Sequence, residues 1–196
     1  MSPRVVQKEE VRARILDSAR KIARSSGWPA VTMRKVAEQI DYTQPVVYEY
    51  FGDKDGMMLC LAEEGFRKLY QNVKTAYDRN NSPARRVEAI ARAYWEMAVQ
   101  DPELYQVMFG LKGGGCKQDH EIADADRTLR LAHMAVGELM LTSGKSGNPR
   151  MAAITLWSLL HGLVALTMAD ILHKKTDPAK AFNYSIKHYI AGYTSK

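Results

Sequence analysis

Proline directly follows a helix-capping residue at four places, and these pairs restrict the fold of this chain more than any other feature. They are Ser82-Pro83, Asp101-Pro102, Asn148-Pro149 and Asp177-Pro178. At a helix start, a Ser, Asp or Asn side chain accepts an otherwise unpaired first-turn N–H, and Pro has no N–H to leave unpaired. The windows that follow have helical rather than alternating periodicity, and no segment is typical of a strand or hairpin. The sequence therefore predicts an all-α fold.

The predicted organisation is a small N-terminal domain of short helices followed by a larger domain of long helices. We expect about nine helices, near residues 6–25, 32–39, 43–50, 53–79, 83–100, 102–110, 119–141, 149–173 and 177–193. The glycine-rich segment 112–115 is expected to be a flexible, mobile connection, and residues 142–147 a second loop. The predicted domains are 1–52 and 53–196, with the fourth helix joining them.

Positive charge is concentrated at the N-terminus. Residues 1–36 hold nine Lys or Arg and three acidic residues, which accounts for the whole net charge of +6. A basic segment on an otherwise neutral chain indicates a polyanionic partner, nucleic acid or an anionic membrane, although a solvated basic helix face would look the same. The chain has two cysteines, without metal-type spacing, and no apolar run at its start. We therefore expect a cytoplasmic protein.

Residues 10–54 have the pattern of a helix-turn-helix. Thr32 is expected to cap one short helix and Thr43 the next, with a tight turn at Asp41 and Tyr42. The second short helix of such a unit enters the major groove of DNA. We expect base contacts from Thr43, Gln44, Pro45 and Val46, because Gln pairs with adenine and Pro or Val contacts the thymine methyl. The expected phosphate-binding and salt-dependent contacts come from Thr32, Arg34, Tyr48, Tyr50 and Lys54.

These residues resemble the TetR family of bacterial transcriptional regulators. The resemblance lies in residues 15–19, 27–37 and 47–57, and the segment Trp157 to Leu163 is similar to a Trp-His-Gly core motif of one subfamily. It implies a helix-turn-helix head, a linking fourth helix and a ligand-binding core. Two departures concern the turn, where the usual Gly is Asp41 and the usual Val is Tyr42. Asp tolerates a left-handed backbone better than most residues, so we expect the turn to survive.

The resemblance also implies a homodimer formed by the last two long helices. Apolar residues on these helices fit that role, and the expected interface residues are Leu156, Leu160, Leu163, Phe182 and Tyr189. A dimer would place two recognition helices about one DNA turn apart, roughly 34–36 Å, on a near-palindromic site.

Methionine and aromatic side chains are frequent in the middle helices, as in adaptable apolar pockets, although simple core packing has the same composition. The expected ligand-binding residues are Trp95, Met108, Phe109, His133, Met134, Trp157 and His161. The expected ligand is a small apolar or amphipathic effector. A buried His that is satisfied by a backbone partner is the alternative interpretation of both histidines.

Residues 151–169 carry no formal charge and are long enough to span a bilayer. A membrane helix is therefore the alternative to a dimer-interface helix for this segment, and a membrane-associated helical protein is the corresponding alternative function.

Enzyme signals are weak: residue 139 is Leu where a phosphate-binding loop ending at Lys145-Ser146 requires Gly. The acidic residues Asp119, Glu121, Asp124 and Asp126 are typical of a helix start, and Cys116 and His120 form a single pair without a second. We therefore expect no catalytic centre, metal or cofactor. The favoured function is a ligand-responsive repressor, and a non-sensing regulator or an activator is the closest alternative.

Overall fold

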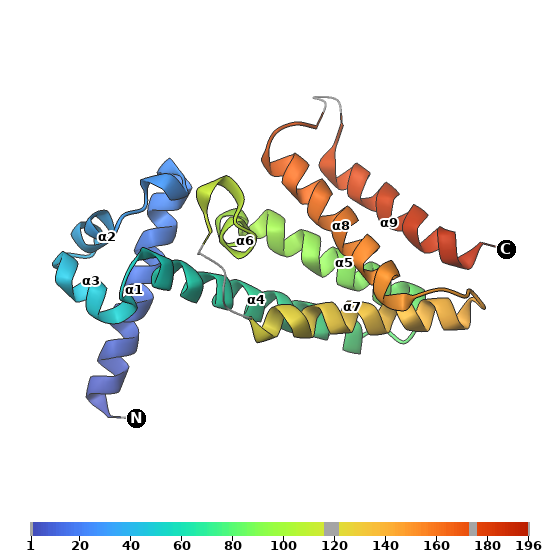
Figure 1. Ribbon diagram of the computed structural model, residues 1–196, viewed down its shortest axis with the longest axis horizontal. Helices are drawn as coiled ribbons and strands as arrows, with labels where there is room; N and C mark the ends of the chain where they lie inside the picture. The colour runs from blue at the N-terminus through green and yellow to red at the C-terminus, as the bar shows by residue number, and fades with distance from the viewer. Residues whose placement is uncertain (1, 116–121, 173–175, 196) are drawn as a thin grey trace. The chain divides into compact units, whose positions relative to one another are not determined.

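The computed structural model describes residues 2–115, 122–172 and 176–195, and this part of the chain is helical without a strand (Figure 1). It forms nine α-helices and two short 3-10 helices, which confirms the predicted fold class. In chain order they are α1 (Pro3–Ser26), η1 (Trp28–Ala30), α2 (Met33–Gln39), α3 (Gln44–Phe51), α4 (Lys54–Asp78), α5 (Pro83–Gln100), α6 (Pro102–Met108), η2 (Leu111–Gly113), α7 (Ala123–Thr142), α8 (Pro149–Met168) and α9 (Pro178–Thr194).

All four predicted helix starts lie at the proline of a capping pair. Two of the capping side chains act as expected: Asn148 accepts from the N–H groups of Arg150 and Met151, and Asp177 accepts from those of Ala179 and Lys180. The Ser82 side chain makes no such bond. The Asp101 carboxylate, which precedes α6, pairs with Lys68 of α4, 3.3 Å away.

Two predicted helix ends differ from the structure. The first helix begins at Pro3 rather than near residue 6, and Ser2-Pro3 is a fifth pair of the same kind. The eighth ends at Met168 rather than 173. Asp170 adopts a φ of 54°, its N–H bonds the carbonyl of Thr167, and the N–H of Ile171 bonds that of Leu166. This left-handed closure satisfies the carbonyls of Leu166 and Thr167 in the last turn and ends the helix. Residues 119–121 of the predicted seventh helix, with Cys116, lie outside the described residues.

The chain divides into two compact units, at points different from the predicted boundary near residue 52. The first unit comprises residues 1–65 and 103–121, and the second comprises residues 66–102 and 122–196. The first unit therefore holds α1 to α3, the beginning of α4, and most of α6 with η2. The second unit holds the rest of α4, together with α5, α7, α8 and α9.

The core of the first unit is organised around Trp28, which is fully buried. Its Nε1 donates to the carbonyl of Glu103 (3.1 Å), at the start of α6. Gly114 is also buried, and a Cβ on it would lie 2.6 Å from the Trp28 ring. Gly114 belongs to the glycine-rich segment 112–115, for which the sequence predicts a flexible connection, and it packs in this core. Its lack of a side chain lets the backbone pack closely against the indole.

The core of the second unit is formed by α5, α7, α8 and α9, which pack on one another. Trp95 on α5 stacks on Phe182 of α9, with ring centroids 5.2 Å apart. The Tyr189 hydroxyl on α9 donates to the carbonyl of Ala152 on α8 (2.7 Å). Both contacts fix α9 against its neighbours.

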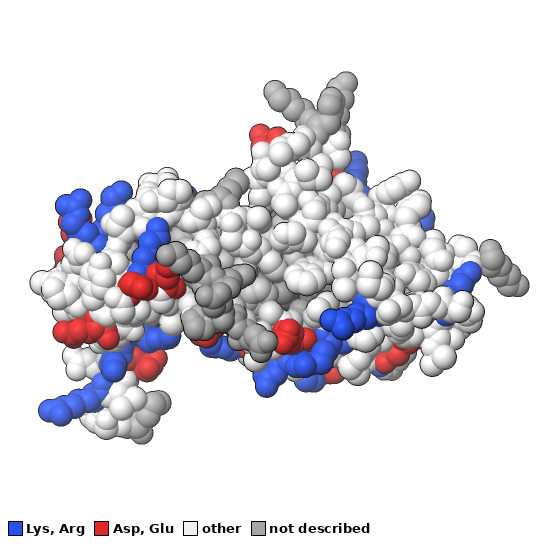
Figure 2. Space-filling view, viewed as in Figure 1, with Lys and Arg blue, Asp and Glu red and all other residues white. Residues whose placement is uncertain are grey.

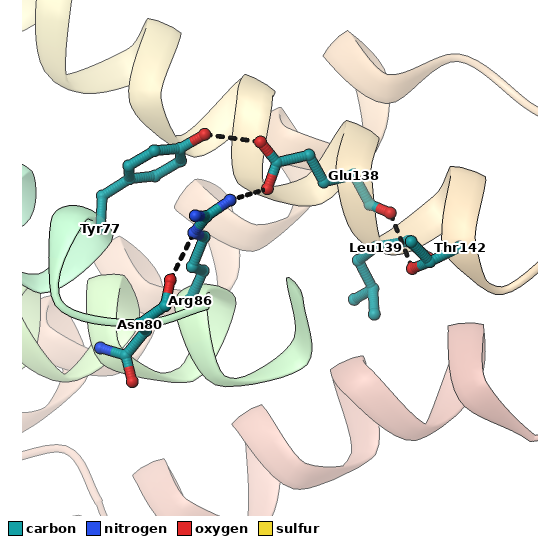
Figure 3. A network of polar contacts seen from close by, with 6 residues as sticks. All are labelled: Tyr77, Asn80, Arg86, Glu138, Leu139 and Thr142. Carbon is teal, nitrogen blue, oxygen red and sulfur yellow. Dashed lines mark hydrogen bonds and ion pairs between the residues drawn. The ribbon is translucent and has the colours of Figure 1, made fainter. Parts of the chain in front are cut away.

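A polar network joins the end of α4 to α5 and α7 within the second unit (Figure 3). Glu138 of α7 accepts from the Tyr77 hydroxyl (2.6 Å) and from Arg86 Nη1 (2.5 Å). Arg86 Nε also donates to the carbonyl of Asn80 (2.6 Å), and its guanidinium lies over the Tyr77 ring. Burial alone would raise the pKa of Glu138. The two hydrogen bonds and the Arg86 charge outweigh it and lower that pKa below its ordinary value.

Candidate nucleic-acid interface and effector site

The start of α2 has the predicted cap. Thr32 Oγ1 accepts from the backbone N–H of Lys35 (3.2 Å), and Thr32 remains exposed. Arg34 is also exposed, and its ion pair with Glu38, one turn further along α2, is long (3.8 Å). An exposed pair at this distance stabilises the helix little, so the guanidinium can reach an external anion.

The turn between α2 and α3 adopts the backbone expected of it. Asp41 has a φ of 60°, the left-handed conformation that Asp tolerates better than most residues. The N–H of Tyr42 bonds back to the carbonyl of Ala37 (3.0 Å) and closes the turn. Thr43 occupies the N-cap position of α3, but its side chain makes no capping bond, which corrects the expectation. Its hydroxyl is exposed at the helix start.

The N-terminal turn of α3 presents side chains outward. Thr43, Gln44 and Pro45 are exposed and Val46 is half-buried. The Gln44 amide lies 3.5 Å from the hydroxyl of Tyr48, which is 42% exposed, so the two form one polar surface. The inward face of the helix is held by Val47 and Phe51, which are buried. Tyr50 is half-buried beside Phe51.

Lys54 begins α4, and its ammonium is engaged within the first unit. Nζ donates to the carbonyl of Trp28, 3.3 Å away, and the side chain is half-buried. One of its three donors is thus committed to the fold, which leaves two for another acceptor. The residue therefore has a structural role that its place in the sequence did not indicate.

The expected effector residues belong to both units: Met108 and Phe109 to the first, and Trp95, His133, Met134, Trp157 and His161 to the second. Met108 is buried where α6 crosses α4, and a Cβ on Gly65 would lie 2.5 Å from it. Phe109 lies against Tyr105, with ring centroids 4.6 Å apart. Trp95 is buried in the stack with Phe182 already described.

Two expected residues of α8, Trp157 and His161, lie beside Tyr94 of α5, which is not among the expected effector residues. Trp157 Nε1 donates to the Tyr94 hydroxyl of α5 (3.3 Å), and His161 Nδ1 lies 3.4 Å from the same oxygen. Burial lowers the pKa of His161, so the imidazole is neutral near pH 7. The i, i+4 spacing of Trp157 and His161 predicts a shared face, but only the packing of α5 on α8 identifies Tyr94. His133 is half-buried and Met134 is 53% exposed on α7.

Three of the five expected dimer-interface residues belong instead to the core of the second unit. Leu156 and Leu160 are 2% and 3% exposed, and Phe182 is 2% exposed. Their face of each helix is covered by neighbouring helices of the same chain, so they are inaccessible to a partner. Leu163 and Tyr189 are half-buried. The outward face of α8 carries Met151 and Leu166 instead, at 58% and 42% exposure.

Helix α8 is also long and apolar enough to cross a membrane by length and composition, with 28% of its most apolar window buried inside the chain. Interface helices and core helices of other proteins meet the same criterion.

In the acidic start of α7, Asp124 pairs with Arg127 (3.1 Å) one turn further along.

A capped α2, a tight turn and an outward-facing α3 define a helix-turn-helix protein, here followed by a helical core.

Two models of known protein families match this chain and agree with that class of protein. Residues 15–61 match the model of the tetR family of bacterial regulatory proteins. Residues 87–189, more than half of the chain, match that of the tetracyclin repressor-like C-terminal domain. The chain therefore belongs to the TetR family, whose members are DNA-binding transcriptional regulators, and these matches give the membrane alternative no support.

Individual relatives are distant. The transcriptional repressor KstR of Rhodococcus jostii is 31% identical over 100 residues, which are 51% of this chain and 46% of that protein. The chain matches 46% to 62% of the length of this relative and of the regulator BetI of Burkholderia cenocepacia. Among solved structures, FadR of Bacillus subtilis in complex with stearoyl-CoA has a TM-score of 0.72 at 14% identity, covering 92% of this chain and 98% of that one. That likeness shows the shared fold.

Proposed function

We propose that this protein is a homodimeric, effector-responsive transcriptional regulator of the bacterial cytoplasm that binds a near-palindromic operator. The observation that carries the proposal is the N-terminal turn of α3, where Thr43, Gln44 and Pro45 are exposed together. An exposed helix start in a helix-turn-helix is the part that reaches base edges in the major groove.

Different residues of this surface would have different tasks. Gln44 would pair with adenine, while Pro45 and Val46 would contact a thymine methyl. Thr32, Arg34, Tyr48, Tyr50 and the remaining donors of Lys54 would hold phosphates and set the register of α3 on the duplex. Without an Arg or Lys on α3, direct readout of guanine by this helix is not expected.

The outward face of α8 supports a dimer. Its surface is almost without charged side chains in Figure 2, and it carries the exposed apolar residues Met151 and Leu166. Tyr184 on α9 is 65% exposed. Apolar side chains gathered on one face of a long helix favour burial against a partner.

The group formed by Tyr94, Trp157 and His161 supports an amphipathic effector. A neutral imidazole and a phenol can exchange hydrogen bonds with a polar group, while the indole contributes apolar surface. FadR of Bacillus subtilis is a fold relative solved with stearoyl-CoA, an amphipathic molecule. An effector that binds best to a conformer with misplaced recognition helices would release DNA.

The decisive experiment is selection of random duplex DNA by the purified protein at two salt concentrations. We expect a near-palindrome with half-sites about one turn apart, and a steep loss of affinity with salt. Gln44→Ala should relax preference at one base pair per half-site by about 1–3 kcal/mol. Arg34→Ala is the matched comparison and should weaken all sequences alike. Identical behaviour of the two variants on operator and random DNA would contradict the assigned roles.

The effector part is tested separately by measuring operator affinity with and without acyl-CoA thioesters of different chain length. We expect at least one to weaken DNA binding, and His161→Phe to reduce that response, because it removes both ring nitrogens while keeping an aromatic side chain. Equal operator affinity throughout, together with no thermal stabilisation by any thioester, would exclude this effector class.

A further inference from the structure

The turn that orients α3 carries an unusual backbone and receives support from another helix. Asp41 holds a φ of 60°, a conformation that side-chain-bearing residues seldom adopt. It lies three residues before Gln44, so the backbone angles at Asp41 and Tyr42 set the direction in which α3 leaves α2. Any contact that holds this turn also determines where the exposed start of α3 points.

Arg14 of α1 contacts the residues on both sides of Asp41. Its Nη2 donates to the carbonyl of Ile40 (2.9 Å), the C-cap residue of α2. Its guanidinium also lies over the ring of Tyr42, 5.4 Å from the centroid. The guanidinium has several N–H donors in a fixed planar group, so it can hold the Ile40 carbonyl and lie over the Tyr42 ring at the same time.

A second residue of α1 reinforces the same end of α2. Ser18, one turn after Arg14, is buried, and its hydroxyl lies within hydrogen-bond distance of the Val36 carbonyl (3.3 Å) and of Gln39 Oε1 (3.0 Å). Arg14 and Ser18 are four residues apart and share a face of α1. Their side chains hold the end of α2 and the turn that follows it.

We propose that Arg14 is a positioning residue for operator recognition: by holding Ile40 and Tyr42 it fixes the turn at Asp41 and thereby the orientation of α3. This inference rests on the proposed DNA-binding function. Arg14 then acts through the turn on base readout rather than as a phosphate contact. It compensates for an Asp at a position where glycine would adopt the required φ at no steric cost.

The test compares Arg14→Gln with Lys21→Gln. Both variants lose one positive charge from α1, and the ion pair of Lys21 is with Asp17 on the same helix (2.7 Å). Affinity is measured for the selected operator and for random duplex DNA over a range of salt. Arg14→Gln should lower operator affinity by about tenfold, the size of one lost base contact, while its random-DNA affinity and salt slope match those of Lys21→Gln. Adding Asp41→Gly should restore part of the lost operator affinity.

Amide hydrogen exchange without DNA gives an independent readout. The Tyr42 N–H, bonded to Ala37, should exchange faster in Arg14→Gln than in the wild type or in Lys21→Gln. If Arg14→Gln does not fold, Arg14→Lys keeps the charge but replaces the planar guanidinium by a single ammonium, and Tyr42 exchange should again be faster than in the wild type.

Two results would overturn the inference. One is a parallel loss on operator and random DNA with a salt slope reduced by about one, which identifies a phosphate contact. The other is Tyr42 exchange unchanged from the control. Failure of the wild type to select any operator would contradict the proposed function instead, and Tyr42 exchange would still test the role of Arg14 in the turn.

Discussion

Single residues in this protein have effects that depend on what lies against them, and Gly114 is one example. A Cβ at this position would lie 2.6 Å from the fully buried Trp28 ring. Gly114→Ala should therefore lower the free energy of unfolding by about 1–3 kcal/mol through overpacking. Gly137→Ala is the control, because its Cβ would lie at an ordinary 3.5 Å from Pro149 and alanine favours a helix. Thermal unfolding of both variants checks the prediction, and equal melting temperatures would refute it.

The Glu138 carboxylate should make the second unit sensitive to acid. Its pKa is lowered in the folded state, so the stability it provides is present above the unfolded pKa of about 4.3 and is lost as the pH falls through the folded value. Glu138→Gln should cost about 1 kcal/mol near pH 7, since the side chain is partly exposed, and should flatten the loss of stability below pH ~4.

The control for this prediction is Glu88→Gln, whose carboxylate makes only an exposed pair with Arg92 on the same helix (3.3 Å). Denaturant unfolding from pH 7 to pH 3, at one protein concentration, measures both variants. If Glu138→Gln follows the wild-type pH profile throughout, the network in Figure 3 contributes no acid-linked stability.

At the scale of whole helices, the capping pairs provide a matched comparison. Asn148 and Ser82 both precede a proline that begins a helix, but only the Asn148 side chain accepts first-turn N–H groups. Asn148→Ala should cost about 1 kcal/mol, and Ser82→Ala much less. Chemical denaturation distinguishes the two, and similar losses would mean that the pairs act alike in solution.

Helix ends show how neighbouring chemistry modifies a local signal. The Asp101 carboxylate pairs with Lys68 on α4, and Asp170 closes α8 by adopting a positive φ. An Asp can cap a helix, form an ion pair or adopt a left-handed backbone, so its residue type alone does not determine which of these it does. Helix existence was predictable because capping and periodicity are local properties, whereas the partner of a cap depends on packing.

The proposed assembly can be tested through the outward face of α8. Leu166→Glu places a charge on the apolar surface and should shift the protein toward monomers, with operator affinity falling at least tenfold because two half-sites are no longer bound together. Val99→Glu is the control, as Val99 is 57% exposed on α5. Sedimentation velocity and operator binding are the measurements. A Leu166→Glu protein that remains dimeric would place the interface elsewhere.

Much of the molecule followed from short-range chemistry. The helical fold, four helix starts, the Thr32 cap, the left-handed Asp41 and the exposed start of α3 were predictable from neighbouring residues. These features depend on backbone conformation and on hydrogen bonds within about one helical turn. The membership of the TetR family follows from the same segments, which the family models match.

Other features required the tertiary structure, because periodicity shows that a face is apolar but not which helix covers it. Leu156, Leu160 and Phe182 were predicted to meet a second subunit, yet helices of the same chain bury them. Contacts between distant segments, such as Gly114 with Trp28 and Arg14 with the α2–α3 turn, leave no periodic pattern. They arise only when packing brings together residues that are far apart in the chain, and this decides which polar and small residues support the recognition helix.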